Sequence, residues 1–177
     1  MPRLSKSEIT ELKLTFEEWQ TPTALYDRVM PILDRIGSVD FFNQGGLTFL
    51  REAWIASRIG LARNAARARL VKDEWPDFEL EINGDVERLE AVEADDPSRR
   101  RGQEYKLDST SAAPDPVEDW IWRADQVPDW LEAACNKKVG KKYKTKVSLV
   151  ILLNMSEYGI RRQQVEECLR PATARAL

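Results

Sequence analysis

Two acidic residues on either side of a tight-turn signal carry the clearest chemical pattern in this chain. Asn83-Gly84 separates two strand-like segments, 76–82 and 85–93. This dipeptide favours a two-residue type I′ turn, because both central residues need positive φ. Counting outward from the turn places Asp77 opposite Glu90. Opposed carboxylates repel each other unless a proton or cation lies between them. The pair therefore predicts a site for Mg²⁺ or Mn²⁺, which could activate water and stabilise charge on a phosphodiester.

The same residues also allow a purely structural interpretation. Side chains alternate along a strand, so one face of the hairpin carries the charged residues and the other is core. The charged face holds Asp77, Glu79, Glu81, Arg88 and Glu90. On this interpretation that face is solvated, and Glu79 and Arg88 form a cross-strand ion pair.

Composition excludes several kinds of active site. The chain contains no His, which removes Ser-His-Asp and Cys-His nucleophiles and His-ligated zinc. It has no GxxxxGK[ST] phosphate loop and no GxGxxG fingerprint. Its two cysteines, Cys135 and Cys168, lack metal-site spacing and read as reduced thiols. Any catalysis must then use carboxylates, lysines, arginines or a bound metal.

Length and charge favour a globular protein in the cytoplasm. The 177 residues are 42% hydrophobic and 32% charged, with a net charge of −3. That length suits a single domain with a real core. A polyanion partner would have to meet a local basic patch, because the overall charge does not attract it. No signal peptide is visible, and the longest apolar run, 147–153, is too short to span a membrane.

The pattern along the chain predicts a mixed α/β fold. A first helix starts at Ser5 or Ser7 and stops before Thr21. Further helices are expected over residues 23–36, 47–70, 117–124, 129–143 and 160–169. Gly45-Gly46 marks a loop over 37–46, and Pro31 would bend the second helix. Residues 147–153 read as a strand buried on both faces, in the middle of a sheet flanked by helices.

Pro76-Asp77, a short turn-containing spacer and Glu90-Ala91-Val92 resemble the motif of the PD-(D/E)xK nuclease superfamily. The order helix, hairpin, helix and apolar strand, over 47–153, is also similar to its restriction-endonuclease-like core. The resemblance implies a small mixed sheet with a β-hairpin and a buried central strand. It makes Asp77 and Glu90 the catalytic, metal-binding acids, with Mg²⁺ or Mn²⁺ as the cofactor. Residues 1–46 would be a helical N-terminal segment packed on a core of 47–177.

The sequence departs from the family at one position. Val92 stands where the family has a lysine. In some members the lysine comes from the following helix, where Lys137 and Lys138 are the candidates and Lys141 is a weaker one. The family also often supplies an acid from the helix before the hairpin, for which Glu52 is a possible match.

Two basic segments could contact a phosphate backbone, because lysine and arginine suit polyanions. The residues assigned to nucleic-acid binding are Arg99, Arg100, Arg101, Lys141 and Lys142. Alternatively, the lysines are a solvated helix C-terminus, where cations favour the negative end of the dipole.

Three functions remain open from the sequence. The first is a metal-dependent nuclease that hydrolyses nucleic-acid phosphodiesters. The second is a catalytically inactive module of the same fold that binds nucleic acid or a protein partner, as Val92 would suggest. The third is a helical partner-binding protein that forms a homodimer.

Overall fold

The computed structural model describes residues 3–72, 75–94, 117–141, 143, 146–153 and 167. These residues fall into two compact units. Unit 1 holds 3–72, 75–91 and 146–148, and unit 2 holds the others. In the described part, four helices and a four-stranded mixed sheet give an α+β fold. The different boundary expected at residue 46 stays a prediction, as does the restriction-endonuclease-like core.

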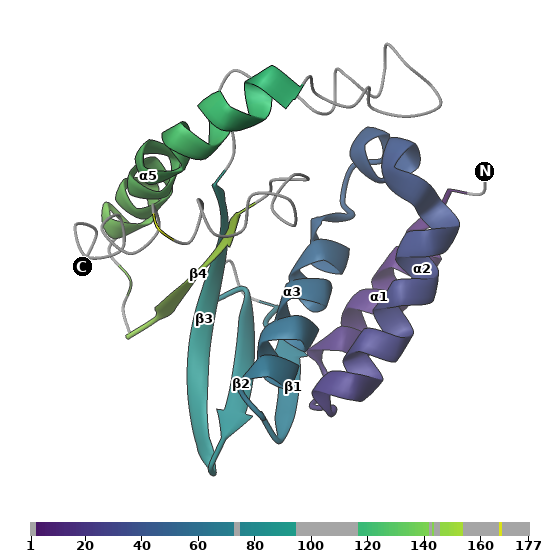
Figure 1. Cartoon of the computed structure of the whole chain (residues 1–177). Helices are drawn as coiled ribbons and strands as arrows, with labels where there is room; N and C mark the ends of the chain where they lie inside the picture. Colours follow the sequence, from purple (N-terminus) through teal and green to yellow (C-terminus); the bar gives the residue numbers. More distant parts are fainter. Residues whose placement is uncertain are drawn as a thin grey trace. The chain divides into compact units, whose positions relative to one another are not determined.

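Three helices open unit 1: α1 (Lys6–Glu17), α2 (Pro22–Asn43) and α3 (Thr48–Ala62). Ser5 caps α1 through a capping box, in which its hydroxyl accepts from the Glu8 backbone N–H and the Glu8 carboxylate accepts from the Ser5 N–H. α2 begins at Pro22, one residue before the expected 23, and Thr21 caps it. In Figure 1 α1 and α2 run beside α3.

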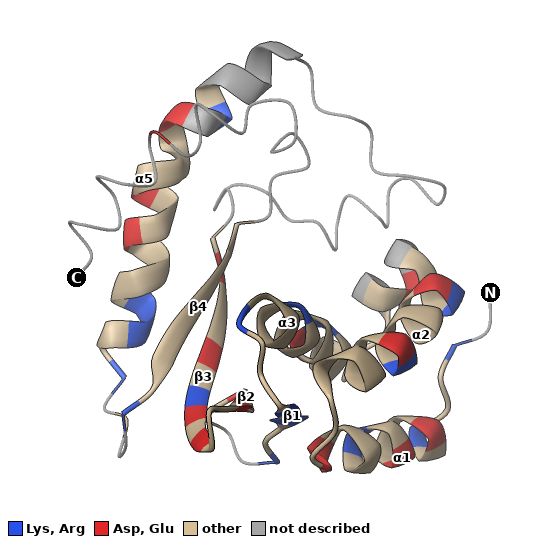
Figure 2. Cartoon of the chain, turned by 60° about the horizontal axis from the view of Figure 1, so that its bottom comes forward, with Lys and Arg blue, Asp and Glu red and all other residues tan. Residues whose placement is uncertain are grey.

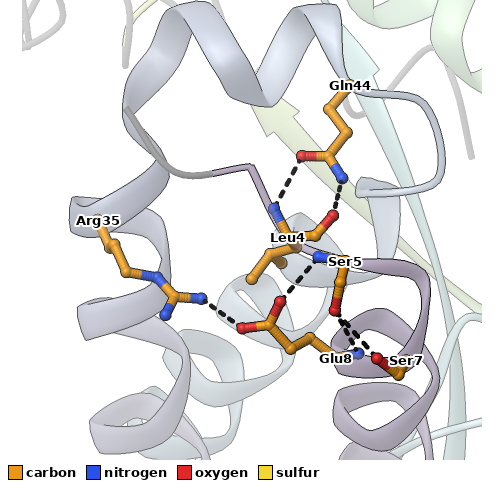
Figure 3. A network of polar contacts seen from close by, with 6 residues as sticks. All are labelled: Leu4, Ser5, Ser7, Glu8, Arg35 and Gln44. Atoms are coloured by element: carbon orange, nitrogen blue, oxygen red, sulfur yellow. Dashed lines mark hydrogen bonds and ion pairs between the residues drawn. The ribbon is translucent and has the colours of Figure 1, made fainter.

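Gln44 fixes the chain just before α1. Its side-chain amide donates to the Leu4 carbonyl at 2.6 Å and accepts from the Leu4 N–H at 3.2 Å, as Figure 3 shows. Glu8 also pairs with Arg35 of α2 at 3.6 Å. These contacts tie the start of α1 to the second helix and to the residue that follows it.

The second and third helices end at different places than the sequence predicts. The helical segment continues to Asn43 and does not stop at Ile36, although Gly37 is non-helical with φ of 68° and divides it at a kink. The expected helix over 47–70 ends at Ala62 instead, and Asn64 adopts a left-handed φ of 53°. Helical periodicity alone did not reveal this stop, because Asn tolerates that conformation without the usual glycine.

The last residues of the range expected to be helical form a strand instead, β1 (Arg67–Leu70). β1 pairs antiparallel with β2 (Phe78–Ile82), matching Leu70 with Phe78. Tertiary pairing outweighs local propensity in so short a segment. An isolated bridge between Gln20 and Ala68 also ties the end of α1 to this strand.

The predicted hairpin is confirmed. β2 pairs antiparallel with β3 (Asp85–Ala94), and both Ile82↔Asp85 and Phe78↔Leu89 are in register. Asn83 and Gly84 have φ of 54° and 87°, as a type I′ turn requires. The turn thus fixes which residues of the two strands can lie side by side.

α3 packs on α2, β1 and β2 to make the core of unit 1. The core side chains with essentially no exposure include Phe16, Leu25, Val29, Leu50, Phe78 and Leu80. At Gly60, α3 approaches both neighbours closely, because an added Cβ would lie 2.8 Å from Pro22 Cγ and 3.4 Å from Leu80 Cδ2. Gly60 therefore lets α3 lie close to both α2 and the sheet.

Unit 2 contains the end of β3, helix α5 (Val117–Val139) and β4 (Ser148–Leu153), except that Ser148 belongs to unit 1. Its core holds Val92, Ala94, Val127, Trp130, Leu131 and Ala134, with Leu149, Ile151 and Leu153 packed against it. The helices expected over 117–124 and 129–143 are one helix, which passes through Pro128 and ends at Val139.

β4 differs from the expected central strand. The strand order is β1-β2-β3-β4, so among the described strands β4 is at one end, and each of its residues is only partly buried. A continuous apolar run signals burial but does not give the position of a strand within its sheet. The expected helix over 160–169 lies outside the described residues, apart from Glu167.

Replacing Gly60 with Ala should lower the free energy of unfolding by about 1 kcal/mol, because a Cβ meets the rigid ring of Pro22 and only part of that cost is offset by the higher helix propensity of Ala. Urea unfolding measures this. Gly45→Ala is the control, because nothing lies within 4 Å of a Cβ there. Equal losses in both variants would contradict the close packing.

Candidate functional site

Asp77 lies where the hairpin ladder ends. The register stops at Phe78↔Leu89, so Asp77 and Glu90 do not form the next ladder pair. Instead, Asp77 Oδ2 accepts a hydrogen bond from the Ala91 N–H at 2.7 Å, and its carbonyl accepts from the Val71 N–H at 3.1 Å. The Asp77 carboxylate is therefore fixed against β3, one residue beyond Glu90.

Glu90 is only 2% exposed, and Glu79 only 6%. The expectation of a solvated charged face is therefore wrong at these two positions. Glu79 does form the expected ion pair with Arg88, at 3.3 Å, and a shorter one with Arg69, at 2.8 Å. A buried carboxylate needs such partners, since burial without them penalises the charge. Glu79 thus belongs to the framework of the sheet.

Glu52 of α3 joins Asp77 and Glu90 electrostatically. The pKa of Glu52 is raised to about 7, first by burial and then by repulsion from the nearby Asp77 carboxylate. Glu90 acts in the same direction, while Arg51 and Lys13 oppose the shift. The fold thus brings Glu52 of α3 within electrostatic range of Asp77 and Glu90, on the two sides of the hairpin. The sequence had suggested Glu52 only through the family pattern, because its distance along the chain hides this proximity.

A pocket of about 220 Å³ opens at two of these acids. Its lining comes from α1, α3, β1 and the residues between β1 and β2. The lining residues are Lys13, Glu17, Phe49, Glu52, Leu70, Val71, Lys72 and Asp77. Sequence reasoning missed Lys13, Glu17 and Lys72, because no spacing rule links them to the hairpin. The pocket combines carboxylates that could hold a cation with ammonium groups that could hold an anion.

The donor set fits a hard divalent cation in part. Mg²⁺ is commonly bound by one or two carboxylates and keeps several waters, so Glu52 and Asp77 in one pocket meet its minimum. Yet within the described ranges, no three Asp, Glu or Cys side chains are arranged closely enough to hold a metal ion. A cation here would therefore need water or substrate oxygens as its further ligands.

Position 92, where the motif that the hairpin resembles carries a lysine, is buried in this chain. Val92 is 9% exposed and packs in the core of unit 2 with Trp130 and Leu131. The candidate replacements, Lys137 and Lys138, lie in the last turn of α5, where Figure 2 shows basic residues. Their role stays a prediction.

The remaining predicted binding residues are only partly covered by the structure. Lys141 is exposed just after α5. Arg99, Arg100, Arg101 and Lys142 lie outside the described residues. Binding of nucleic acid and formation of a homodimer remain predictions.

Comparisons of the chain with protein-family models, curated proteins and solved structures found no match. In the part of the chain that is described, none of the helices combines the length and apolar character needed to cross a bilayer. The case for function accordingly rests on the pocket and its charges.

The pKa of Glu52 predicts a pH effect on stability. The pKa of Glu52 is higher in the folded than in the unfolded chain. The contribution of its protonation to folding stability is therefore fully present below about pH 4.5 and is lost as the pH rises through about 7. Glu52→Gln should therefore be more stable than the wild type by about 2 kcal/mol at pH 8 and no more stable at pH 4.5. Urea unfolding across this range measures the difference. Glu11→Gln, on the exposed side of α1, is the control. A stability difference between Glu52→Gln and the wild type that stays the same at every pH would contradict the raised pKa of Glu52.

Proposed function

We propose that unit 1 is a metal-dependent nuclease-like unit that hydrolyses nucleic-acid phosphodiesters. One observation carries this proposal: Asp77 and Glu52 line the same pocket, and Glu90 lies next to the residue that fixes Asp77. Clustered carboxylates raise each other's affinity for a cation, because the cation removes their repulsion. The resemblance of the Pro76-Asp77 and Glu90 elements to the PD-(D/E)xK motif supports the same function.

In this proposal Asp77 and Glu52 hold Mg²⁺ or Mn²⁺, and Glu90 adds negative charge behind them. The bound ion would supply Lewis acidity at the phosphate and lower the pKa of a bound water. The Ala91 N–H orients Asp77, leaving the aspartate little freedom to turn away from the pocket. At neutral pH Glu52 is close to half-protonated, so ion binding would release a proton from it.

Cleavage of bis(p-nitrophenyl) phosphate, a phosphodiester without bases, tests the chemistry independently of sequence preference. We expect turnover with Mn²⁺ or Mg²⁺ that falls by about 100-fold in Asp77→Asn and Glu52→Gln. The Glu11→Gln variant should keep the wild-type rate. Cleavage that survives the loss of both pocket acids would remove them from the mechanism.

One observation favours a second candidate, a catalytically inactive module of similar fold that binds nucleic acid or a protein partner. The side chain at position 92 packs among apolar residues of unit 2, so the usual lysine has no place there. This candidate predicts salt-dependent binding of nucleic acid with no turnover in any divalent metal.

Because position 92 is a core position, Val92→Lys should not create or improve activity. Burying an ammonium among these apolar side chains should lower the free energy of unfolding by about 2 kcal/mol or more. Val86→Lys is the control, because Val86 is 45% exposed on the same strand. A stable Val92→Lys protein with increased cleavage would show instead that the side chain can reach the site.

A further inference from the structure

The first helix brings a positive charge to the pocket of Asp77 and Glu52. Lys13, on α1, lines this pocket, and its Nζ lies 5.4 Å from the centre of the Phe49 ring. Phe49 lines the same pocket and is itself 6% exposed. A cation over an aromatic face is attracted to it, so the ring holds the ammonium at the pocket wall.

Several contacts fix α1 in this place. The capping box at Ser5 sets where the helix begins, and Gln44 holds Leu4 by two hydrogen bonds (Figure 3). At the other end, Gln20 and Ala68 exchange two backbone hydrogen bonds, of 3.1 and 2.7 Å. Phe16, one turn beyond Lys13, is fully buried with its ring 6.0 Å from that of Phe49. Lys13 is therefore presented by a helix that is tied down along its length.

We propose that Lys13 binds the phosphate of the ligand in this pocket and supplies the positive charge that position 92 lacks. This inference rests on the proposed function, because it takes the ligand to be a phosphodiester. A lysine ammonium is a compact charge with three donors that suits a phosphate oxygen. The three pocket carboxylates, Glu17, Glu52 and Asp77, would repel a phosphate on their own, so an anionic ligand needs such a group beside them.

Lys72 is the competing residue, since it lines the same pocket. Both lysines are exposed, but Lys72 follows the end of β1, whereas Lys13 lies over the Phe49 ring on a helix held at both ends. The geometry therefore favours Lys13 as the preorganised cation. In this proposal α1 is part of the functional site and does more than cover the fold.

The experiment uses the full chain with Lys13→Met, Lys13→Arg, Lys72→Met and, as a matched control on the same helix, Lys6→Met. Binding of a fluorescent single-stranded oligonucleotide is measured in Ca²⁺, and turnover of bis(p-nitrophenyl) phosphate in Mn²⁺. We expect Lys13→Met to weaken oligonucleotide binding by about 10-fold and to raise KM, with partial rescue in Lys13→Arg. Lys6→Met should match the wild type, and thermal unfolding confirms that each variant is folded.

The outcomes separate this inference from the proposed function. If the wild type cleaves and Lys13→Met behaves like it, the role of Lys13 is overturned while the nuclease proposal stands. A loss confined to Lys72→Met would likewise overturn it. If the wild type binds without cleaving and only Lys13→Met loses binding, the lysine role holds and the nuclease proposal fails. A wild type that neither binds nor cleaves overturns both.

Discussion

The register of one β-hairpin controls where the charged groups of unit 1 lie. Positive φ at Asn83 and Gly84 makes a two-residue turn, and this turn leaves the strands no freedom to slide. A shift by one residue would exchange the core and charged faces of both strands. The turn therefore places Phe78 and Leu80 under α3 and Asp77 beside β3. Everything proposed for the pocket depends on that placement.

The charged residues of the hairpin fall into two groups with different physical roles. Glu79 is nearly buried, yet Arg69 and Arg88 satisfy it, so it stabilises the sheet as a paired charge. Asp77 instead uses its carboxylate to satisfy the Ala91 N–H just beyond the end of the ladder. The same bond orients Asp77 toward a pocket that Glu52 also lines. One hydrogen bond thus both satisfies the Ala91 N–H and orients Asp77, a candidate metal ligand.

The pocket carries charges of both signs, which suit cations and anions alike. Burial, and after it repulsion from Asp77 and Glu90, raises the pKa of Glu52 to about 7. Lys13 and Lys72 approach from other elements. A phosphodiester together with a divalent cation would satisfy both sets of charges. A pocket whose charges all had the same sign would not bind both ligands.

The sequence by itself determined the hairpin, its turn and its register. A type I′ turn needs positive φ at both central residues, and Asn and Gly adopt that conformation readily. It also limited the cap of α1 to Ser5 or Ser7, of which the structure shows Ser5, and it excluded histidine chemistry. Only the tertiary structure decided that residues 67–70 are a strand, that β4 ends the strand order, and that Val92 is core. It also brought Lys13, Glu52 and Asp77 to one pocket. Those outcomes depend on packing between segments far apart in the chain, about which local spacing carries no information.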